Sequence, residues 1–251
     1  MSGHNKWSSI KHRKGAQDAK RGKVFTKISK ELTVAARIGG GDPSGNPRLR
    51  LALANARAAS MPSDTVTRAI KKGTGELGAD QIQEMVYEGY GPGGVAFIVE
   101  VASDNANRTS SEVRNLFEKS GGNLAKSGAV SFLFNRRGMV RYDAAKYTEE
   151  KVMEAALEAG AEDVVAEGDH VVVYTEPARF HAVKEALDAA GLEALAAELT
   201  MVPTNTVACK DEDLARRTMK LMEKLEDQED VQNVYANFDI PESLMAQLHE
   251  G

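Results

Sequence analysis

The chain has 251 residues and a formal net charge of −5, and its 42% hydrophobic and 27% charged residues are typical of a globular protein. Its single cysteine, Cys209, excludes an intramolecular disulfide bond, which fits a reducing compartment. No apolar run approaches the roughly 20 residues of a membrane span, and none follows the basic N-terminus as in a secretory signal, so we expect a cytoplasmic protein.

Positive charge is concentrated in the first third of the chain. Residues 1–80 hold 16 Lys and Arg against 6 Asp and Glu, whereas residues 81–251 hold 16 against 31. Such asymmetry predicts a polyanion-binding region carried on an acidic body. The alternative is that the two oppositely charged parts attract each other within the fold.

Residues 1–23 are predicted to form a basic arm. Trp7 and Ile10 are its only large apolar side chains, so the segment cannot build a core of its own. A flexible cationic segment can follow a phosphate backbone and release its counterions. Trp7 has two interpretations: its ring stacks on an unpaired base, or it docks the arm on the helices that follow.

A three-helix domain is predicted over residues 24–80. Apolar residues recur at helical spacing from Val24, and the predicted helices cover residues 24–38, 47–59 and 63–73. Asn46 followed by proline is typical of a helix start, with Asn46 as the N-cap. Ser60 or Ser63 is expected to cap the third helix.

The chain then changes to alternating helix and strand patterns. Predicted strands cover residues 95–101, 130–134, 139–142, 163–165, 170–174, 194–202 and 231–238, and predicted helices cover residues 109–119, 149–159, 178–190 and 212–225. Residues 149–202 have the order α-β-β-α-β, which is most of a split βαβ sandwich. These residues separate an earlier β-α-β segment, 95–134, from the helix and strand predicted over 212–238, which complete the same domain.

The predicted fold class is therefore α+β and multidomain. A basic arm and an N-terminal three-helix domain precede two ferredoxin-like (split βαβ) α/β domains, one inserted in the other. The predicted boundaries are 1–23 for the arm, 24–80 for the helical domain, 81–137 and 203–251 for the discontinuous α/β domain, and 138–202 for the inserted domain.

No motif points to catalysis, to a cofactor or to a metal. The histidines and Cys209 lack the spacing of zinc ligands, and there is no G-x-S-x-G elbow. The glycine-rich segment 87–94 precedes a strand, whereas a phosphate-binding loop follows one. We expect a non-enzymatic protein without a cofactor or bound metal, and with no small-molecule substrate or membrane partner.

The candidate nucleic-acid-binding residues are the basic side chains of the arm and of the helices, with Trp7 as a stacking ring. Few acidic residues balance these cations. The full set is Lys6, Trp7, Lys11, His12, Arg13, Lys14, Lys20, Arg21, Lys23, Lys27, Arg37, Arg48, Arg50, Arg57, Arg68, Lys71 and Lys72. No group is obviously placed to read base edges, so the pattern does not indicate readout of a specific sequence.

Long segments of the chain resemble the YebC/PmpR family. They are the opening GHNKWSSIKHRKGAQDAKRGKVFTKISKEL, the loop GGGDPSGNPRLR, the block MPSDTVTRAIKKG, and YEGYGPGGVAF followed by SDNANRT and GGNLAKSGAVSFLF. The resemblance covers essentially the whole chain and implies a helical domain and two α/β domains, one inserted in the other. It implies no catalytic residues. It assigns polyanion contact to the matching residues of the N-terminal motif: Lys6, Lys11, His12, Arg13, Lys14, Lys20, Arg21 and Lys23.

The resemblance also implies a role in gene expression. Family members are commonly described as probable transcriptional regulators that bind DNA, the mitochondrial relative as a translational activator of cytochrome c oxidase, and bacterial relatives are linked to the ribosome and to relief of stalling at proline-rich stretches. A DNA-binding regulator is thus one hypothesis and a ribosome- or RNA-binding translation factor its alternative. The basic arm and the lack of a base-reading helix favour the alternative. A third hypothesis is a scaffold whose acidic body binds a basic protein.

Overall fold

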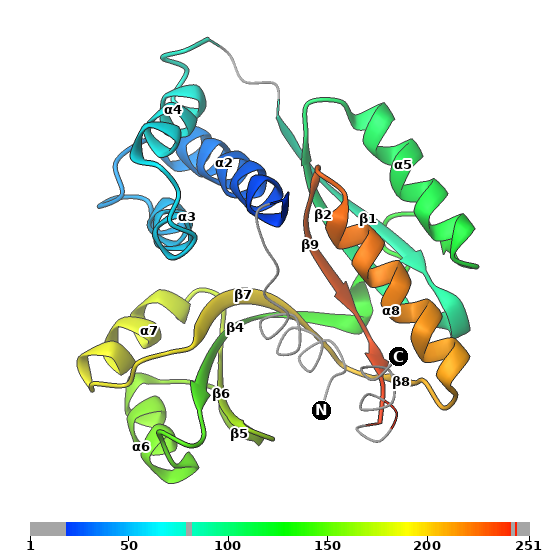
Figure 1. The fold of residues 1–251 in the computed structure, drawn as a ribbon. Coiled ribbons are helices and arrows are strands. Elements are labelled where there is room, and N and C mark those ends of the chain that lie inside the picture. Colours follow the sequence, from blue (N-terminus) through cyan, green and yellow to red (C-terminus); the bar gives the residue numbers. More distant parts are fainter. Residues whose placement is uncertain (1–18, 79–81, 242–243, 245–251) are drawn as a thin grey trace. The chain divides into compact units, whose positions relative to one another are not determined.

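The computed structural model describes residues 19–78, 82–241 and 244 of the chain. These residues belong to two compact units (Figure 1). One is the continuous segment Leu133–Thr204, called the inserted unit below. The other, called the outer unit, consists of the described residues before and after that segment. The chain therefore leaves the outer unit after residue 132 and returns to it at residue 205.

Three helices begin the outer unit: α2 (Ala19–Gly39), α3 (Pro47–Ala58) and α4 (Ser63–Gly73). Leu32 and Ala35 of α2 are fully buried in one apolar cluster with Leu49 of α3 and Ala69 of α4. The predicted N-cap of α3 is confirmed, because Asn46 Oδ1 accepts a 3.0 Å hydrogen bond from the Leu49 backbone N–H. The apolar periodicity of the sequence thus identifies the side of α2 that faces α3 and α4.

Two local predictions for these helices are wrong. α2 begins at Ala19 rather than at Val24, so the last residues of the predicted arm are helical. Alanine, lysine and arginine favour helix, which lets α2 extend beyond its apolar stripe. No serine side chain caps α4: Ser63 is already its first residue, and the N-cap position is held by Pro62, without a side-chain hydrogen bond.

A four-stranded antiparallel sheet forms the rest of the outer unit. Its strands are β1 (Gln83–Tyr90), β2 (Ala96–Ser103), β3 (Asn123–Leu124) and β9 (Val231–Ala236), in the order β3-β1-β2-β9. The outer unit also contains the 3₁₀ helix η1 (Pro92–Gly94) and the parallel pair β8 (Val207–Ala208) and β10 (Phe238–Asp239). A second 3₁₀ helix, η2 (Ser131–Leu133), ends at the first residue of the inserted unit.

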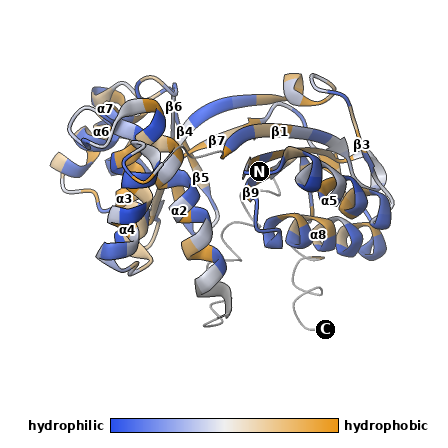
Figure 2. Cartoon of the chain, turned by 90° about the horizontal axis from the view of Figure 1, so that it is seen from above, coloured by the Kyte–Doolittle hydropathy of each residue, from blue (hydrophilic) through white to orange (hydrophobic). Residues whose placement is uncertain are grey.

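Two helices, α5 (Ala106–Lys119) and α8 (Glu212–Asp227), lie side by side on one face of this sheet (Figures 1 and 2). Phe117 of α5 and Leu221 of α8 are fully buried in the same cluster as Phe97 of β2. The Phe97 and Phe117 rings meet edge to face, with centroids 5.8 Å apart. Figure 2 shows both hydrophilic and hydrophobic residues along α8, as expected for a helix with one buried face.

The outer sheet differs from the predicted ferredoxin-like sandwich. The sequence pattern does not predict β1, because Glu84, Glu88 and Gly89 interrupt its apolar positions, yet β1 pairs with β2 along its whole length. The predicted strand at 130–134 is also wrong. The N–H groups of Val130 and Ser131 donate to the Glu88 carboxylate rather than to a strand, and η2 follows. The strands of this sheet and the two helices that cover it therefore follow the order β1-β2-α5-β3-α8-β9, that is β-β-α-β-α-β.

The inserted unit has the element order β-α-β-β-α-β, which is that of a split βαβ sandwich. Its strands are β4 (Phe134–Asp143), β5 (Asp163–Glu167), β6 (His170–Thr175) and β7 (Ala196–Pro203), and its helices are α6 (Glu149–Ala159) and α7 (Phe180–Ala189). The sheet is antiparallel throughout, in the order β5-β6-β4-β7. Val140, Val152 and Leu187 are completely buried in this unit.

β4 runs straight through a turn that the sequence predicts at residues 135–138. Residues 134–141 pair continuously with β7, so the strand crosses the predicted boundary between residues 137 and 138. Gly138 serves close packing instead of a turn: a Cβ there would lie 2.3 Å from Thr175 Oγ1 and 2.5 Å from Phe180 Cδ2.

A Gly138→Ala substitution should therefore destabilise the inserted unit. The added methyl group must displace the Thr175 and Phe180 side chains, and overpacking of this kind costs about 1–3 kcal/mol. Chemical denaturation of the purified protein would measure the loss. Gly45→Ala is the matched control, because a Cβ at Gly45 meets no atom within 4 Å. Equal denaturation midpoints for the two variants would contradict the assignment of Gly138 to close packing.

Candidate nucleic-acid interface

Eight of the predicted contact residues have no described side chain. Lys6, Trp7, Lys11, His12, Arg13 and Lys14 lie outside the described residues. Lys20 and Arg21 lie in the first turn of α2, where the backbone alone is described. The role of the arm, with both interpretations of Trp7, stays a prediction. The other nine residues have described side chains.

Lysines of α2 bind the C-terminal end of α8. Lys23 Nζ donates to the carbonyl oxygen of Asp227 at 3.2 Å, and Lys27 Nζ donates to that of Glu226 at 2.6 Å. The last carbonyl groups of a helix lack partners within the helix and carry partial negative charge. Lys23 and Lys27 therefore attach α2 to α8, a role that the sequence analysis does not predict.

Arg48 of α3 joins two acidic side chains from other elements. Its Nε atom lies 2.7 Å from Glu31 Oε1 of α2, and its Nη2 atom lies 2.6 Å from Glu84 Oε1 of β1. The hydrogen bond to Glu31 raises the pKa of the Arg48 guanidinium, against the opposing effect of burial. Arg48 thus links the helices to the sheet and is not available as a free cation.

Two further arginines donate to backbone carbonyl groups. Arg37 Nη1 donates to the carbonyl oxygen of Ile82, immediately before β1. Arg50 Nη1 donates to the carbonyl oxygens of Pro43 at 2.8 Å and Ser44 at 2.9 Å, in the loop that precedes α3. Both side chains therefore stabilise local structure, although a neutral carbonyl acceptor leaves the positive charge of each guanidinium in place.

Four predicted cations have no hydrogen-bond or ion-pair partner among the described residues: Arg57, Arg68, Lys71 and Lys72. All four are exposed. Arg68, Lys71 and Lys72 of α4 are spaced three and four residues apart, so they crowd one side of the helix, where like charges repel. The helix dipole offsets part of this repulsion, since both lysines lie in the last turn. α4 thus presents unneutralised positive charge to solvent.

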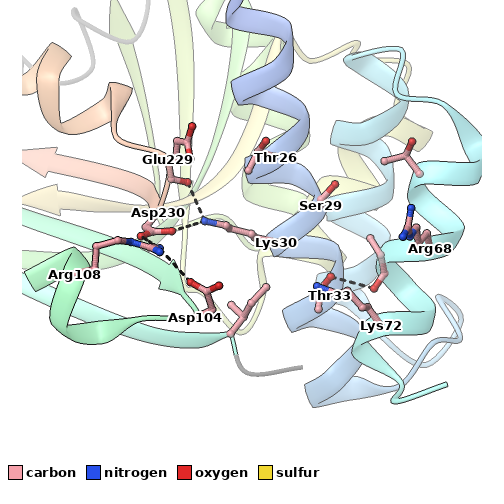
Figure 3. Close-up of a pocket in the computed structure, with 13 residues that line it drawn as sticks. Thr26, Ser29, Lys30, Thr33, Arg68, Lys72, Asp104, Arg108, Glu229 and Asp230 are labelled. Carbon is pink, nitrogen blue, oxygen red and sulfur yellow. Dashed lines mark hydrogen bonds and ion pairs between the residues drawn. The ribbon is translucent and has the colours of Figure 1, made fainter. Parts of the chain in front are cut away.

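Arg68 and Lys72 also line a cleft of about 790 Å³ within the outer unit (Figure 3). On the α2 side the lining includes the hydroxyl groups of Thr26 and Ser29, and on the α4 side it includes that of Thr65. Hydroxyl groups and cations together are the side-chain types that contact phosphate and sugar oxygens. The α2 and α4 side of the cleft therefore offers groups suited to phosphate, whereas the lining also includes the acidic residues Asp104, Glu229 and Asp230.

A buried carboxylate, that of Asp230, lines the same cleft and is 3% exposed. Its oxygens accept hydrogen bonds from Lys30 at 2.6 Å, Thr109 at 2.6 Å, Arg108 at 2.9 Å and Ser103 at 3.0 Å. Burial alone would raise the pKa of Asp230, but the hydrogen bonds from Lys30, Thr109 and Arg108 hold it well below its usual range. The carboxylate is thus ionised and already matched by two cations.

Sequence patterns alone do not identify the residues that fix this arrangement. The sequence does indicate that Lys30 lies on the same helix face as Lys23 and Lys27, because the three lysines are spaced four and three residues apart. Arg108 and Asp230 have none, since 122 positions separate them and only the paired strands and helices bring them together. The cleft itself is therefore a result of tertiary structure.

Within the described ranges, no three His, Cys, Asp or Glu side chains are grouped as metal ligands, and no helix is long and apolar enough to cross a membrane. The thiol of Cys209 is buried, and burial raises its pKa. A raised pKa disfavours the thiolate, which is the nucleophilic form.

Comparison with known proteins gives matches along almost the whole chain. Residues 5–76 match the family model described as the TACO1/YebC protein N-terminal domain, and residues 82–238 match the one described as the TACO1/YebC second and third domain. A crystal structure of a conserved hypothetical protein from Aquifex aeolicus has a TM-score of 0.82 at 48% sequence identity, covering 90% of this chain and 93% of that one.

Curated relatives also match this chain over nearly its full length. A probable transcriptional regulatory protein from Treponema denticola is 56% identical over 242 residues, which cover 96% of this chain and 98% of the relative. Another from Trichlorobacter lovleyi is 54% identical over 248 residues, covering 99% and 100%. Since both family models and these near-full-length relatives agree, the chain belongs to the TACO1/YebC family, which the sequence analysis identifies as YebC/PmpR.

Proposed function

We propose that this protein is a non-enzymatic regulator of gene expression in the cytoplasm, and that it binds nucleic acid through the helices of its outer unit. The observation that carries this proposal is the group of cations on α4, Arg68, Lys71 and Lys72, which are exposed and lack partners among the described residues. Phosphate groups would neutralise them and release counterions. Because relatives carry the name probable transcriptional regulatory protein, duplex DNA is the first candidate target.

The basic arm extends this proposed interface. Lys11, Arg13 and Lys14 of the arm are spaced by few other residues, and the arm leads directly into α2. Phosphate contacts of this kind give affinity that falls with salt and carries little sequence information. The proposal therefore requires no base-reading helix.

The cleft favours a second candidate, a translation factor that binds RNA or the ribosome. Its volume of about 790 Å³ is in the range of small-molecule sites, so it admits part of a single strand but not a duplex. Sequence-specific RNA recognition uses unpaired nucleotides in loops and bulges. Single-stranded oligonucleotides that compete with duplex DNA for Arg68 and Lys72 would support this candidate.

The triple variant Arg68→Ala, Lys71→Ala, Lys72→Ala tests the proposal. The slope of log K against log salt for a duplex should become shallower by about 2–3 units, because each lost phosphate contact removes about 0.9 unit. Fluorescence anisotropy with a labelled duplex at several salt concentrations measures this slope.

A second triple variant controls for net charge. Arg216→Ala, Arg217→Ala, Lys220→Ala removes the same charge from exposed positions of α8, where both arginines pair with acidic residues of the same helix. Its slope should match the unchanged protein. If both triple variants change the slope equally, α4 is not the contact surface and the proposal fails.

A further inference from the structure

One loop of the outer unit differs in charge from the acidic body around it. Residues 81–251 hold 31 Asp and Glu, yet the 24 positions between Glu118 and Asp143 hold none, together with five Lys and Arg. The first half of this acid-free stretch is the segment 120–132, which follows α5, contains β3 and ends within η2. Called the Glu88 loop below, it contains one basic residue, Lys126, and no acidic residue.

Glu88 of β1 fixes this loop. Its side chain is 5% exposed, and its carboxylate oxygens accept hydrogen bonds from the backbone N–H groups of Gly128 at 2.7 Å, Val130 at 2.7 Å and Ser131 at 2.9 Å. Burial alone would raise the pKa of Glu88, but these hydrogen bonds lower it. The carboxylate therefore stays ionised inside the loop and is screened from any ligand outside it.

Other contacts to β1 hold the same loop. The Ala125 N–H donates to the Glu88 carbonyl oxygen at 2.8 Å, and Tyr90 Oη donates to the carbonyl oxygen of Ala129 at 3.0 Å. β3 adds backbone pairing with Gly89 and Tyr90. With both of its ends and its centre bonded to one strand, the loop has little freedom to lose when it binds a partner.

The exposed side chains of this loop include an aromatic ring and two polar groups. Phe132 is 71% exposed, the largest exposure among the large hydrophobic side chains of the described residues. Lys126 and Ser127 are also exposed, and their side chains have no polar partner within the described ranges. Single exposed hydrophobic residues are common. Here, however, the ring follows directly on a segment that a buried carboxylate holds in one conformation.

We propose that the Glu88 loop is a base-stacking contact, in which Phe132 stacks on an unpaired nucleobase of a single-stranded segment and Lys126 contacts a neighbouring phosphate. The inference rests on the proposed function and adds a second contact, away from α4, that distinguishes unpaired strands from duplexes. Every base has a π face, so such a contact tolerates different sequences. Because no acidic residue lies between Lys119 and Tyr142, the loop itself adds no negative charge that would repel a phosphate.

Substitutions at Phe132 test the proposal, using a fluorescently labelled single-stranded oligonucleotide of about a dozen nucleotides. Phe132→Ala should weaken binding by about 10- to 100-fold, the range measured for loss of one stacking ring. Phe132→Trp should bind as tightly as the unchanged protein. Phe132→Leu should lose nearly as much as Phe132→Ala, because leucine keeps apolar area but no π face. Leu157→Ala, at another exposed residue (59%), is the control and should bind normally.

The salt dependence separates stacking from charge. Phe132→Ala should leave the slope against salt unchanged, whereas Lys126→Ala should make it shallower by about 0.7 unit, the value for one contact to a single strand. If Phe132→Ala binds within twofold of the unchanged protein while the α4 triple variant does not, this inference fails and the proposed function stands. If the unchanged protein binds neither single strands nor duplexes, the proposed function itself fails.

A protein partner would give a different result. If Phe132→Leu keeps full affinity, or if Phe132→Ala reduces sedimentation with ribosomes without changing oligonucleotide binding, then Phe132 enters an apolar pocket rather than stacking on a base. Either result would overturn the proposal.

Discussion

An Asp230→Ala variant should lose about 3–5 kcal/mol of unfolding free energy, the range for removing one partner of a buried ion pair. Asp230 lies 2.6 Å from Lys30 Nζ and 2.9 Å from Arg108 Nη2, and the Lys30 side chain is only 16% exposed. Without the carboxylate, the poorly solvated Lys30 ammonium loses its counter-charge and lies near a second cation, the 47% exposed side chain of Arg108. Thr109 and Ser103 also lose their acceptor. Urea denaturation followed by circular dichroism measures the change.

Asp227→Ala is the matched control for this substitution. Asp227 pairs with Lys23 at 3.7 Å, but its side chain is 69% exposed, and exposed pairs contribute about 0–1 kcal/mol. The control should therefore change the unfolding free energy little. A loss of less than about 1 kcal/mol in Asp230→Ala would show that Asp230 does not hold α2 to the rest of the outer unit.

The same carboxylate should make stability depend on pH. Because the folded protein lowers the pKa of Asp230, its stabilising effect is fully present above the unfolded pKa of about 4 and is lost as pH falls towards the folded pKa. Asp230→Asn removes this titration. The difference in unfolding free energy between the unchanged protein and Asp230→Asn should therefore shrink as pH falls below about 4. A constant difference would contradict the lowered pKa.

A Glu88→Ala variant should lose about 2–4 kcal/mol of unfolding free energy. Its carboxylate accepts from three backbone N–H groups, and a buried donor that loses its acceptor costs about 1–3 kcal/mol. Hydrogen exchange should locate the effect, with faster exchange at Gly128, Val130 and Ser131. The unfolding free energy of Glu88→Gln should lie between those of Glu88→Ala and the unchanged protein, since one amide oxygen remains as an acceptor.

Glu118→Gln provides the control for that change. Glu118 is exposed on α5, near the start of the loop in sequence, and its neutralisation should leave both the stability and the exchange rates unchanged. Protected amides at Gly128 and Ser131 in Glu88→Ala would mean that something other than Glu88 holds the loop. A loop fixed by Glu88 would then no longer support the proposal that Phe132 stacks on a base.

Sequence patterns predict the elements whose structure is determined locally. Asn46 caps α3 because the signal lies within four residues, and α6 has the predicted bounds because its apolar periodicity and Gly160 are adjacent. The sequence pattern does not predict β1, because glutamate residues such as those of this strand are usually exposed. Glu88 is buried, and its three donors come from a segment about 40 positions away.

Gly138 shows the opposite error. Glycine after two arginines is typical of a turn, but the requirement at this position is space for Phe180, which only the folded sheet reveals. For the candidate interface, sequence identifies which residues are basic but not which are already bonded. Arg48 and Arg68 look alike in the sequence, yet Arg48 pairs with Glu31 and Glu84, whereas Arg68 has no such partner in the described part of the chain. Pairing of this kind depends on tertiary structure.

The most direct test of nucleic-acid binding through α4 is co-sedimentation with ribosomes at physiological ionic strength, with and without excess random duplex DNA. We expect the unchanged protein to be bound, either in the ribosome pellet or on the duplex, and the variant Arg68→Ala, Lys71→Ala, Lys72→Ala to remain free. Pelleting that survives the duplex would favour the translation candidate, and loss to the duplex would favour DNA. If the unchanged protein binds neither, or if the variant binds equally well, the central claim is contradicted.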